Sequence, residues 1–253
     1  MPNPQRNSIE FKVWGRYAMF TDPLTKIGGE KCSYQVPTYE ALKGVAKSIY
    51  WKPTFIWVID EVRVMKRIRT QTKGTKPLNF NDVYPTLAIY TFLTGDPDAV
   101  TGEPGVEYQV RAHFEWNEHR PKLANDRIEG KHFEIARRML GRGGRQDIFL
   151  GTRDCQGYVE PCEFGSGPGH YDNGGGLAFG LMFHGFDYPD ETGEDKLYTR
   201  FWTPKMTDGV IHFVRPKDCP VRKFVHEMKP KQFESSQSLK GVETEMAELE
   251  VEA

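Results

Sequence analysis

The fold is decided by two neighbouring stretches, TYEALKGVAKSIY at residues 38–50 and TFIWVIDEVRVMKR at residues 54–67. Apolar residues recur at every third or fourth position of the first stretch, which predicts an amphipathic helix with Thr38 as its N-cap. Pro53 prevents the helix from continuing. The second stretch is rich in β-branched and aromatic residues and then alternates with basic residues, which predicts a strand.

Similar patterns surround this unit. Further strands are expected at residues 8–20, 84–93, 106–116 and 147–151, and a second helix at residues 130–140. The order is therefore β-α-β followed by a second β-α-β, which is the ferredoxin-like (RRM-like) pattern of an α+β protein. In this fold the two helices are antiparallel on one face of the sheet. The end of the first helix, at Tyr50, should therefore lie beside the start of the second, at Lys131 and His132.

Glycine becomes frequent after residue 165, and short strands are expected at residues 177–186, 196–202 and 210–213. We therefore predict a ferredoxin-like domain at residues 1–165, a small antiparallel β domain at residues 166–232 and an acidic, disordered tail at residues 233–253. Residues 73–82 and 95–105 are expected to form exposed loops.

The composition excludes several classes of protein. An aromatic content of 13% is too high for a disordered chain. No apolar run reaches the roughly 18 residues of a membrane span, and the N-terminus lacks a signal core, so we expect no membrane partner and a cytoplasmic protein. Four scattered cysteines form no disulfide or zinc pattern, and nucleotide-binding loops, zinc-protease motifs and hydrolase elbows are absent from the sequence. We expect no cofactor and no metal.

Charge is concentrated locally although the net charge is only −1. Residues 61–76 carry six basic residues and one acidic residue, and residues 111–153 carry ten basic and six acidic residues. These stretches fit an anionic partner such as a nucleic acid, and equally a solvated charged surface. The pair Lys131-His132 lies in the first turn of an expected helix, where backbone N–H groups favour a phosphate. Taken alone, it also fits an exposed helix start, and Tyr50 also fits a core aromatic.

Longer strings carry a resemblance to a known family. They include VPTYEALKG at residues 36–44, SIYWKP at 48–53, EGKHF at 129–133, DIFLG at 147–151 and HGFDYPDETG at 184–193. In the same order, from about residue 9 to residue 231, the chain resembles the CRISPR-associated protein of type I-C (Dvulg) systems. That protein is the d (or c) variant of the fifth Cas family, in the RAMP superfamily.

The resemblance implies a RAMP domain followed by a small β domain. It also implies an endoribonuclease that cuts precursor CRISPR RNA in the repeat, near the hairpin base. The enzyme then retains the 5′ handle as a subunit of the interference complex. The family's catalytic Tyr, Lys and His match Tyr50, Lys131 and His132.

The chemistry of these residue types is compatible with metal-independent cleavage, in which the RNA's own 2′-hydroxyl attacks the adjacent phosphate and leaves a 2′,3′-cyclic phosphate. We assign the phosphorane charge to Lys131. His132 and Tyr50 share proton transfer and orientation, with the direction left open.

Candidate RNA-binding residues follow the two basic stretches: Arg63, Lys66, Arg67, Arg69, Arg137, Arg138, Arg142 and Arg145. We expect about half of them to be ordinary solvated surface. Two other functions stay open, a non-catalytic subunit that only binds the RNA handle and a metal-dependent unspecific DNA nuclease. A small-molecule enzyme fits the basic stretches poorly.

Overall fold

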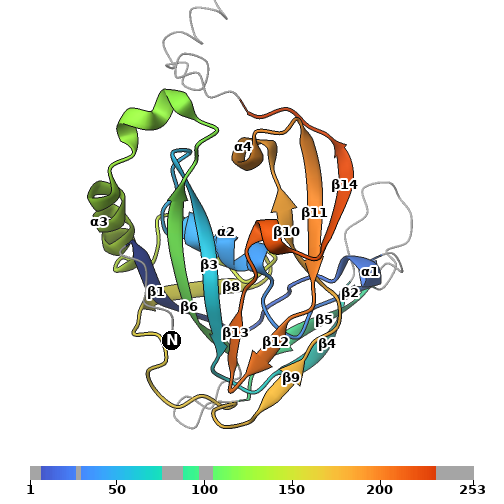
Figure 1. Cartoon of the computed structure of the whole chain (residues 1–253). Helices are drawn as coiled ribbons and strands as arrows, with labels where there is room; N and C mark the ends of the chain where they lie inside the picture. The colour runs from blue at the N-terminus through green and yellow to red at the C-terminus, as the bar shows by residue number, and fades with distance from the viewer. Residues whose placement is uncertain (1–6, 27–29, 76–87, 97–104, 232–253) are drawn as a thin grey trace, which may run out of the picture.

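The computed structural model describes residues 7–26, 30–75, 88–96 and 105–231. Within these ranges the protein is a mixed α+β structure with one sheet of eight strands and two sheets of three strands (Figure 1). In the same ranges no helix is long and apolar enough to cross a membrane.

The eight-stranded sheet runs in the order β7-β8-β1-β6-β3-β13-β12-β9. Its strands are β1 (Ser8–Gly15), β3 (Phe55–Val64), β6 (Val106–Trp116), β7 (Ile148–Phe149), β8 (Gln156–Pro161), β9 (Gly176–Ala178), β12 (Lys205–Thr207) and β13 (Val210–His212). The first small sheet contains β2 (Lys31–Cys32), β5 (Ala88–Thr94) and β4 (Arg69–Thr75), and the second contains β10 (Met182–Asp187), β11 (Lys196–Trp202) and β14 (Val221–Glu227). The helices are α1 (Pro23–Lys26), α2 (Tyr39–Ile49), α3 (Glu129–Leu140) and α4 (Pro189–Thr192), with 3₁₀ turns η1 (Pro121–Asp126) and η2 (Pro216–Asp218).

The centre of the large sheet has the ferredoxin-like arrangement. The first β-α-β unit is β1-α2-β3 and the second is β6-α3-β8. Strands β1 and β6 pair antiparallel in the middle, with β8 outside β1 and β3 outside β6. Helix α2 contacts β3, and α3 contacts β1 and β8. The predicted α+β, ferredoxin-like fold class is confirmed.

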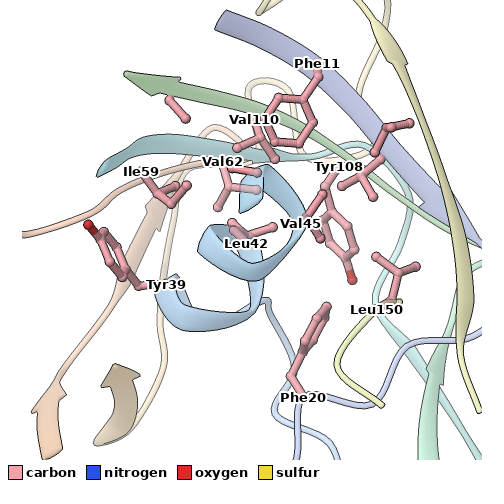
Figure 2. Close-up of a cluster of buried hydrophobic side chains, with 14 of the residues drawn as sticks. Phe11, Phe20, Tyr39, Leu42, Val45, Ile59, Val62, Tyr108, Val110 and Leu150 are labelled. Carbon is pink, nitrogen blue, oxygen red and sulfur yellow. The ribbon is translucent and has the colours of Figure 1, made fainter. Parts of the chain in front are cut away.

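Helix α2 forms as its sequence predicts. The hydroxyl of Thr38 accepts a hydrogen bond from the backbone N–H of Ala41 at 3.2 Å, so Thr38 is the N-cap. The apolar face of the helix is buried against the sheet, and Figure 2 shows Leu42 and Val45 among sheet side chains that include Val62 and Val110. This packing places the C-terminal end of α2 at a defined point above the sheet.

Shortening a buried side chain on this face is expected to destabilise the protein. Leu42→Ala should lower the free energy of unfolding by about 2–5 kcal/mol, because it removes buried methyl groups and leaves a cavity. Gly44→Ala is the matched control on the same helix, since a Cβ at Gly44 would meet no atom within 4 Å. That change should raise the stability by about 0.5–1 kcal/mol. Urea unfolding measures the free energy of unfolding of both variants. A smaller loss of stability for Leu42→Ala than for an alanine substitution at an exposed site would contradict the packing.

Several element boundaries differ from the sequence-based expectation. The first strand ends at Gly15 and not at residue 20, and β3 ends at Val64 and not at residue 67. The fourth ferredoxin strand is β8, whereas the expected strand at residues 147–151 contributes only the two residues of β7. The reason lies at Gly151, whose φ of 96° turns the chain against the Met19 carbonyl.

Two further expectations were wrong in part. Residues 73–75 belong to strand β4 and not to a loop. The single strand expected at residues 177–186 is two strands in different sheets, β9 and β10. The remaining parts of the loops and strand expected between residues 76 and 104, namely 76–82, 84–87 and 97–104, and the tail at residues 233–253, lie outside the described residues.

The C-terminal part of the chain contributes to two sheets. Strand β13 pairs with β3 and so extends the large sheet with β12 and β9, while β10, β11 and β14 form their own sheet. Helix α4 joins that small sheet to α2, because Glu191 pairs with Lys43 and, at 3.1 Å, with Lys47. Burial alone would raise the pKa of Glu191, but these two ammonium groups outweigh it and lower the pKa. The domain boundary expected at residue 165 stays a prediction.

Candidate active site

Two of the predicted site residues meet in the interior. The hydroxyl of Tyr50 lies 2.9 Å from Nδ1 of His132, although the residues are 82 positions apart in the sequence. Tyr50 directly follows α2, and His132 lies in the first turn of α3. The predicted meeting of these two helix ends is confirmed.

The backbone holds Tyr50 on both sides. Its N–H donates to the Ala46 carbonyl at 3.1 Å and caps the end of α2, and its carbonyl accepts a hydrogen bond from the Trp57 indole at 2.7 Å. The backbone at Tyr50 is extended, so the chain leaves the helix and turns toward β3. These two hydrogen bonds therefore fix the backbone position from which the Tyr50 phenol projects, beside the sheet.

The hydrogen bonds of His132 define its tautomer. Nε2 lies 2.7 Å from the backbone carbonyl of Asp126, which can only accept, so Nε2 carries the proton. In the neutral imidazole of this tautomer Nδ1 carries no proton and accepts the hydroxyl hydrogen of Tyr50. The imidazole is enclosed by aromatic rings, with the Phe55 centroid at 5.3 Å and the Trp116 centroid at 5.8 Å. Both ring nitrogens are thus used inside the protein.

The pair is buried, with His132 0% exposed and Tyr50 keeping 2% exposure. Burial raises the pKa of the Tyr50 phenol, the carboxylate of Asp126 raises it further, and the charge of Arg145 acts in the opposite direction. The phenol therefore keeps its proton at neutral pH. Ionisation of Tyr50 would need a nearby acceptor, and Nδ1 of His132 is in place for that role.

Lys131 lies on the surface beside this pair. Its side chain is 48% exposed, and its ammonium group lies 2.5 Å from a carboxylate oxygen of Asp126. Hydrogen bonds from Lys131 and from the Thr54 hydroxyl, the latter at 2.7 Å, lower the pKa of Asp126. No motif of the sequence singles out Asp126. An acidic residue shortly before the Lys-His pair was the signal that could have found it.

Among the RNA-binding candidates of the first basic stretch, Arg63 is occupied inside the protein. It is 4% exposed, pairs with Asp172 at 2.7 Å, and donates to the carbonyls of Ser166 and Gly167 at 3.1 and 2.9 Å. Arg63 therefore anchors the loop at residues 166–172, and its hydrogen-bond donors are engaged within the protein.

The other candidates of this stretch lie beyond the end of β3. Lys66 is half-buried, Arg67 is exposed, and Arg69 is exposed but pairs with Asp96.

The candidates of the second stretch, Arg137, Arg138, Arg142 and Arg145, are all exposed. Arg137 and Arg138 occupy the last turn of α3, where cations also interact favourably with the helix dipole. Arg145 comes nearest to the site, because its N–H donates to the Ser48 carbonyl at 3.0 Å and its charge acts on Tyr50.

A groove of about 780 Å³ borders the site. It shares Phe55 with the aromatic enclosure of His132 and contains Trp51, which is 38% exposed. Its charged lining comprises five basic and three acidic side chains: Lys47, Lys52, Arg120, Arg145, Lys231, Glu40, Asp190 and Glu191. Two of the acids are paired, Asp190 with Arg120 at 2.6 Å and Glu191 with Lys47 at 3.1 Å. The groove therefore suits a polyanion with bases that can stack.

No group of three or more His, Cys, Asp or Glu side chains in the described ranges converges as metal ligands would.

The ferredoxin-like sheet, with its Tyr-His pair at the meeting helix ends, defines an α+β protein of the RAMP type. Residues 8–214 match the model of the Cas5d family, described as CRISPR-associated protein (Cas_Cas5). The chain belongs to this family.

Two curated relatives are both named CRISPR pre-crRNA endoribonuclease Cas5d. The protein of Mannheimia succiniciproducens is 31% identical over 149 residues, which cover 54% of this chain and 64% of the relative. The protein of Thermus thermophilus is 29% identical over 194 residues, which cover 75% of this chain and 77% of the relative.

Solved structures are similar as well. One described as a CRISPR-associated protein has a TM-score of 0.69 at 32% identity and covers 85% of this chain and 96% of its own. A functionally uncharacterised protein of Streptococcus mutans, SMU1763c, has a TM-score of 0.68 at 36% identity and covers 87% of this chain and 100% of its own.

Proposed function

We propose that this protein is an endoribonuclease that cuts precursor CRISPR RNA within each repeat, near the base of its hairpin. The hydrogen bond between Tyr50 and His132, with Lys131 beside it, carries the proposal. The names of the two relatives support the substrate. After the cut the protein keeps the 5′ handle as a subunit of the type I-C interference complex, in the cytoplasm where the RNA is made.

The reaction is attack of the RNA's 2′-hydroxyl on the adjacent phosphate. The ammonium of Lys131, partly exposed, stabilises the negative charge that develops on the phosphorane oxygens. The Tyr50–His132 pair moves the protons, and each such role contributes roughly 10²–10⁴-fold to the rate. No metal ion is needed for these steps, since the nucleophile belongs to the RNA.

Incubation of the pure protein with the repeat hairpin RNA in excess EDTA tests this function. We expect a single cut whose upstream product ends in a 2′,3′-cyclic phosphate. Tight binding without a cut would make the protein a handle-binding subunit only. A cut that appears only on adding a divalent cation would favour the metal-dependent nuclease, for which DNA should then be tried as substrate.

The groove beside the site is the proposed path of the single-stranded RNA that flanks the hairpin. Lys52 and Arg145 lie in its lining, and within the described ranges neither forms an ion pair with a carboxylate. Changing both to alanine should weaken RNA binding. It should also reduce the magnitude of the slope of log K against log salt concentration by about 1.4, since each phosphate contact on a single strand contributes about 0.7 to that slope.

Lys196 and Lys223 serve as the matched control pair. Both are exposed and lie on the small C-terminal sheet, outside the groove lining. Their double alanine variant should keep the wild-type salt slope. Equal slopes for all three proteins would remove the groove from the RNA path.

A further inference from the structure

We propose that Asp126 is a positioning residue for RNA cleavage, the third member of a chain that runs from Tyr50 through His132 to Asp126. In this chain Tyr50 faces the RNA 2′-hydroxyl, and His132 acts behind it as the base. The inference rests on the proposed function, because it assigns a direction to the proton transfer at the same site.

Two polar groups of Asp126 face one nitrogen. The backbone carbonyl lies 2.7 Å from Nε2 of His132, and a carboxylate oxygen lies 3.4 Å from the same atom. The carbonyl fixes the tautomer, and the carboxylate stands where it stabilises a positive charge on the imidazole. An aspartate in the catalytic triad of serine proteases has this same pair of effects on its histidine.

The carboxylate is itself held in place. Thr54 donates a hydrogen bond to it at 2.7 Å, and Thr54 is buried. The carbonyl of Thr54 accepts the N–H of Asn117 at 2.9 Å, so the residue before β3 is tied to the residue after β6. Thr54 therefore connects Asp126 to the sheet on which the site is built.

The direction of proton transfer follows from the hydrogen-bonding capacity that His132 and Tyr50 have left. Both nitrogens of His132 are engaged within the protein, so His132 has no free nitrogen for the RNA. The Tyr50 oxygen donates one hydrogen bond to Nδ1 and keeps acceptor capacity for the hydrogen of a 2′-hydroxyl. Tyr50, which keeps 2% exposure where His132 has none, is thus the member of the chain left to contact the substrate.

The cleavage step moves protons along the chain and exchanges one oxygen on phosphorus for another. The 2′ oxygen loses its proton to the Tyr50 oxygen while the Tyr50 proton moves to Nδ1 of His132. The 2′ oxygen forms a bond to phosphorus, the bond from phosphorus to the 5′ oxygen breaks, and the departing 5′ oxygen takes a proton from water. The imidazolium that results lies beside the Asp126 carboxylate and later returns its proton to solvent through Tyr50.

The test is single-turnover cleavage of the repeat hairpin RNA in EDTA, measured over a range of protein concentrations. Asp126→Asn should lower the maximal rate at least about tenfold, because the charge beside the imidazolium is lost. The half-saturating protein concentration should stay within about twofold of the wild-type value or fall, because Lys131 is released to the phosphate. A rate equal to or above that of the wild type would overturn the proposal, since Asp126 would then only mask Lys131.

Thr54 provides a second, milder pair of variants. Thr54→Val removes the hydroxyl at nearly constant shape and should also lower the maximal rate, whereas Thr54→Ser keeps the hydroxyl and should restore it. Reaction amplitude gives the folded, active fraction separately from the rate, so a merely structural defect would lower the amplitude alone. Equal rates for the valine and serine variants would contradict the role of the Thr54 hydrogen bond.

Two further variants separate this inference from the proposed function. Glu118→Gln removes an exposed carboxylate that pairs with Arg127 at 2.7 Å, and it should keep the wild-type rate. His132→Ala combined with Asp126→Asn should be no slower than His132→Ala alone, because the two residues act in one chain. If His132→Ala itself cleaves normally, the proposed site fails. If only the Asp126 and Thr54 variants cleave normally, the positioning role alone fails.

Discussion

Replacing His132 by alanine is expected to lower single-turnover cleavage of the repeat RNA at least about 10²-fold, because proton transfer by a positioned side chain contributes roughly 10²–10⁴-fold. The change removes the acceptor of the Tyr50 hydroxyl, and the rings of Phe55 and Trp116 that enclose the imidazole cannot take a proton in its place. RNA affinity should stay nearly unchanged, since the imidazole is buried and both of its nitrogens bond within the protein.

The readouts are the cleavage rate with protein in excess and RNA binding by fluorescence anisotropy. His226→Ala is the matched control, because His226 is exposed on β14 in the small C-terminal sheet. This variant should cleave at the wild-type rate. His132→Gln, which keeps a polar side chain in the cavity, covers the case in which the alanine variant unfolds. An unchanged rate in a folded variant would return His132 to a purely structural role in the core.

A single 2′-deoxy nucleotide on the 5′ side of the cut is expected to abolish cleavage. The proposed nucleophile is the hydroxyl that this change removes, so no contribution from Lys131, Tyr50 or His132 can compensate for its loss. Binding should be preserved, because one hydroxyl among the many phosphate and sugar contacts of a hairpin contributes little to affinity.

The measurement compares hairpin RNAs that carry one deoxy position each. Deoxy substitution of the nucleotide one position upstream or one position downstream of that nucleotide is the control and should leave the cut in place. Continued cleavage at the substituted position would show that water is the nucleophile, and it would replace the 2′-hydroxyl mechanism by a hydrolytic one.

Part of the fold and of the site could be predicted because it depends on local patterns and on topology. The helical spacing and the Thr38 cap predicted α2, and both appear in the structure. The β-α-β order then required the ends of α2 and α3 to meet, so the proximity of Tyr50 and His132 followed from the fold class.

Other features depend on which groups become buried together, and sequence patterns do not report this. Arg63 belongs to a basic stretch like its neighbours, yet the loop at residues 166–172 closes over it and takes its hydrogen-bond donors. The strand expected at residues 177–186 divides between two sheets because its two halves find different partners, β12 and β11.

By itself, the sequence determined the element order, the α+β class, the family resemblance and the three candidate residues Tyr50, Lys131 and His132. Only the tertiary structure decided that Tyr50 and His132 are enclosed, that Lys131 stays at the surface, and that Asp126 contacts both members of the Lys-His pair. The physical reason is that periodicity and capping act over a few neighbouring residues. Burial, tautomer and ion pairing are set by groups that only the folded chain brings within hydrogen-bonding distance.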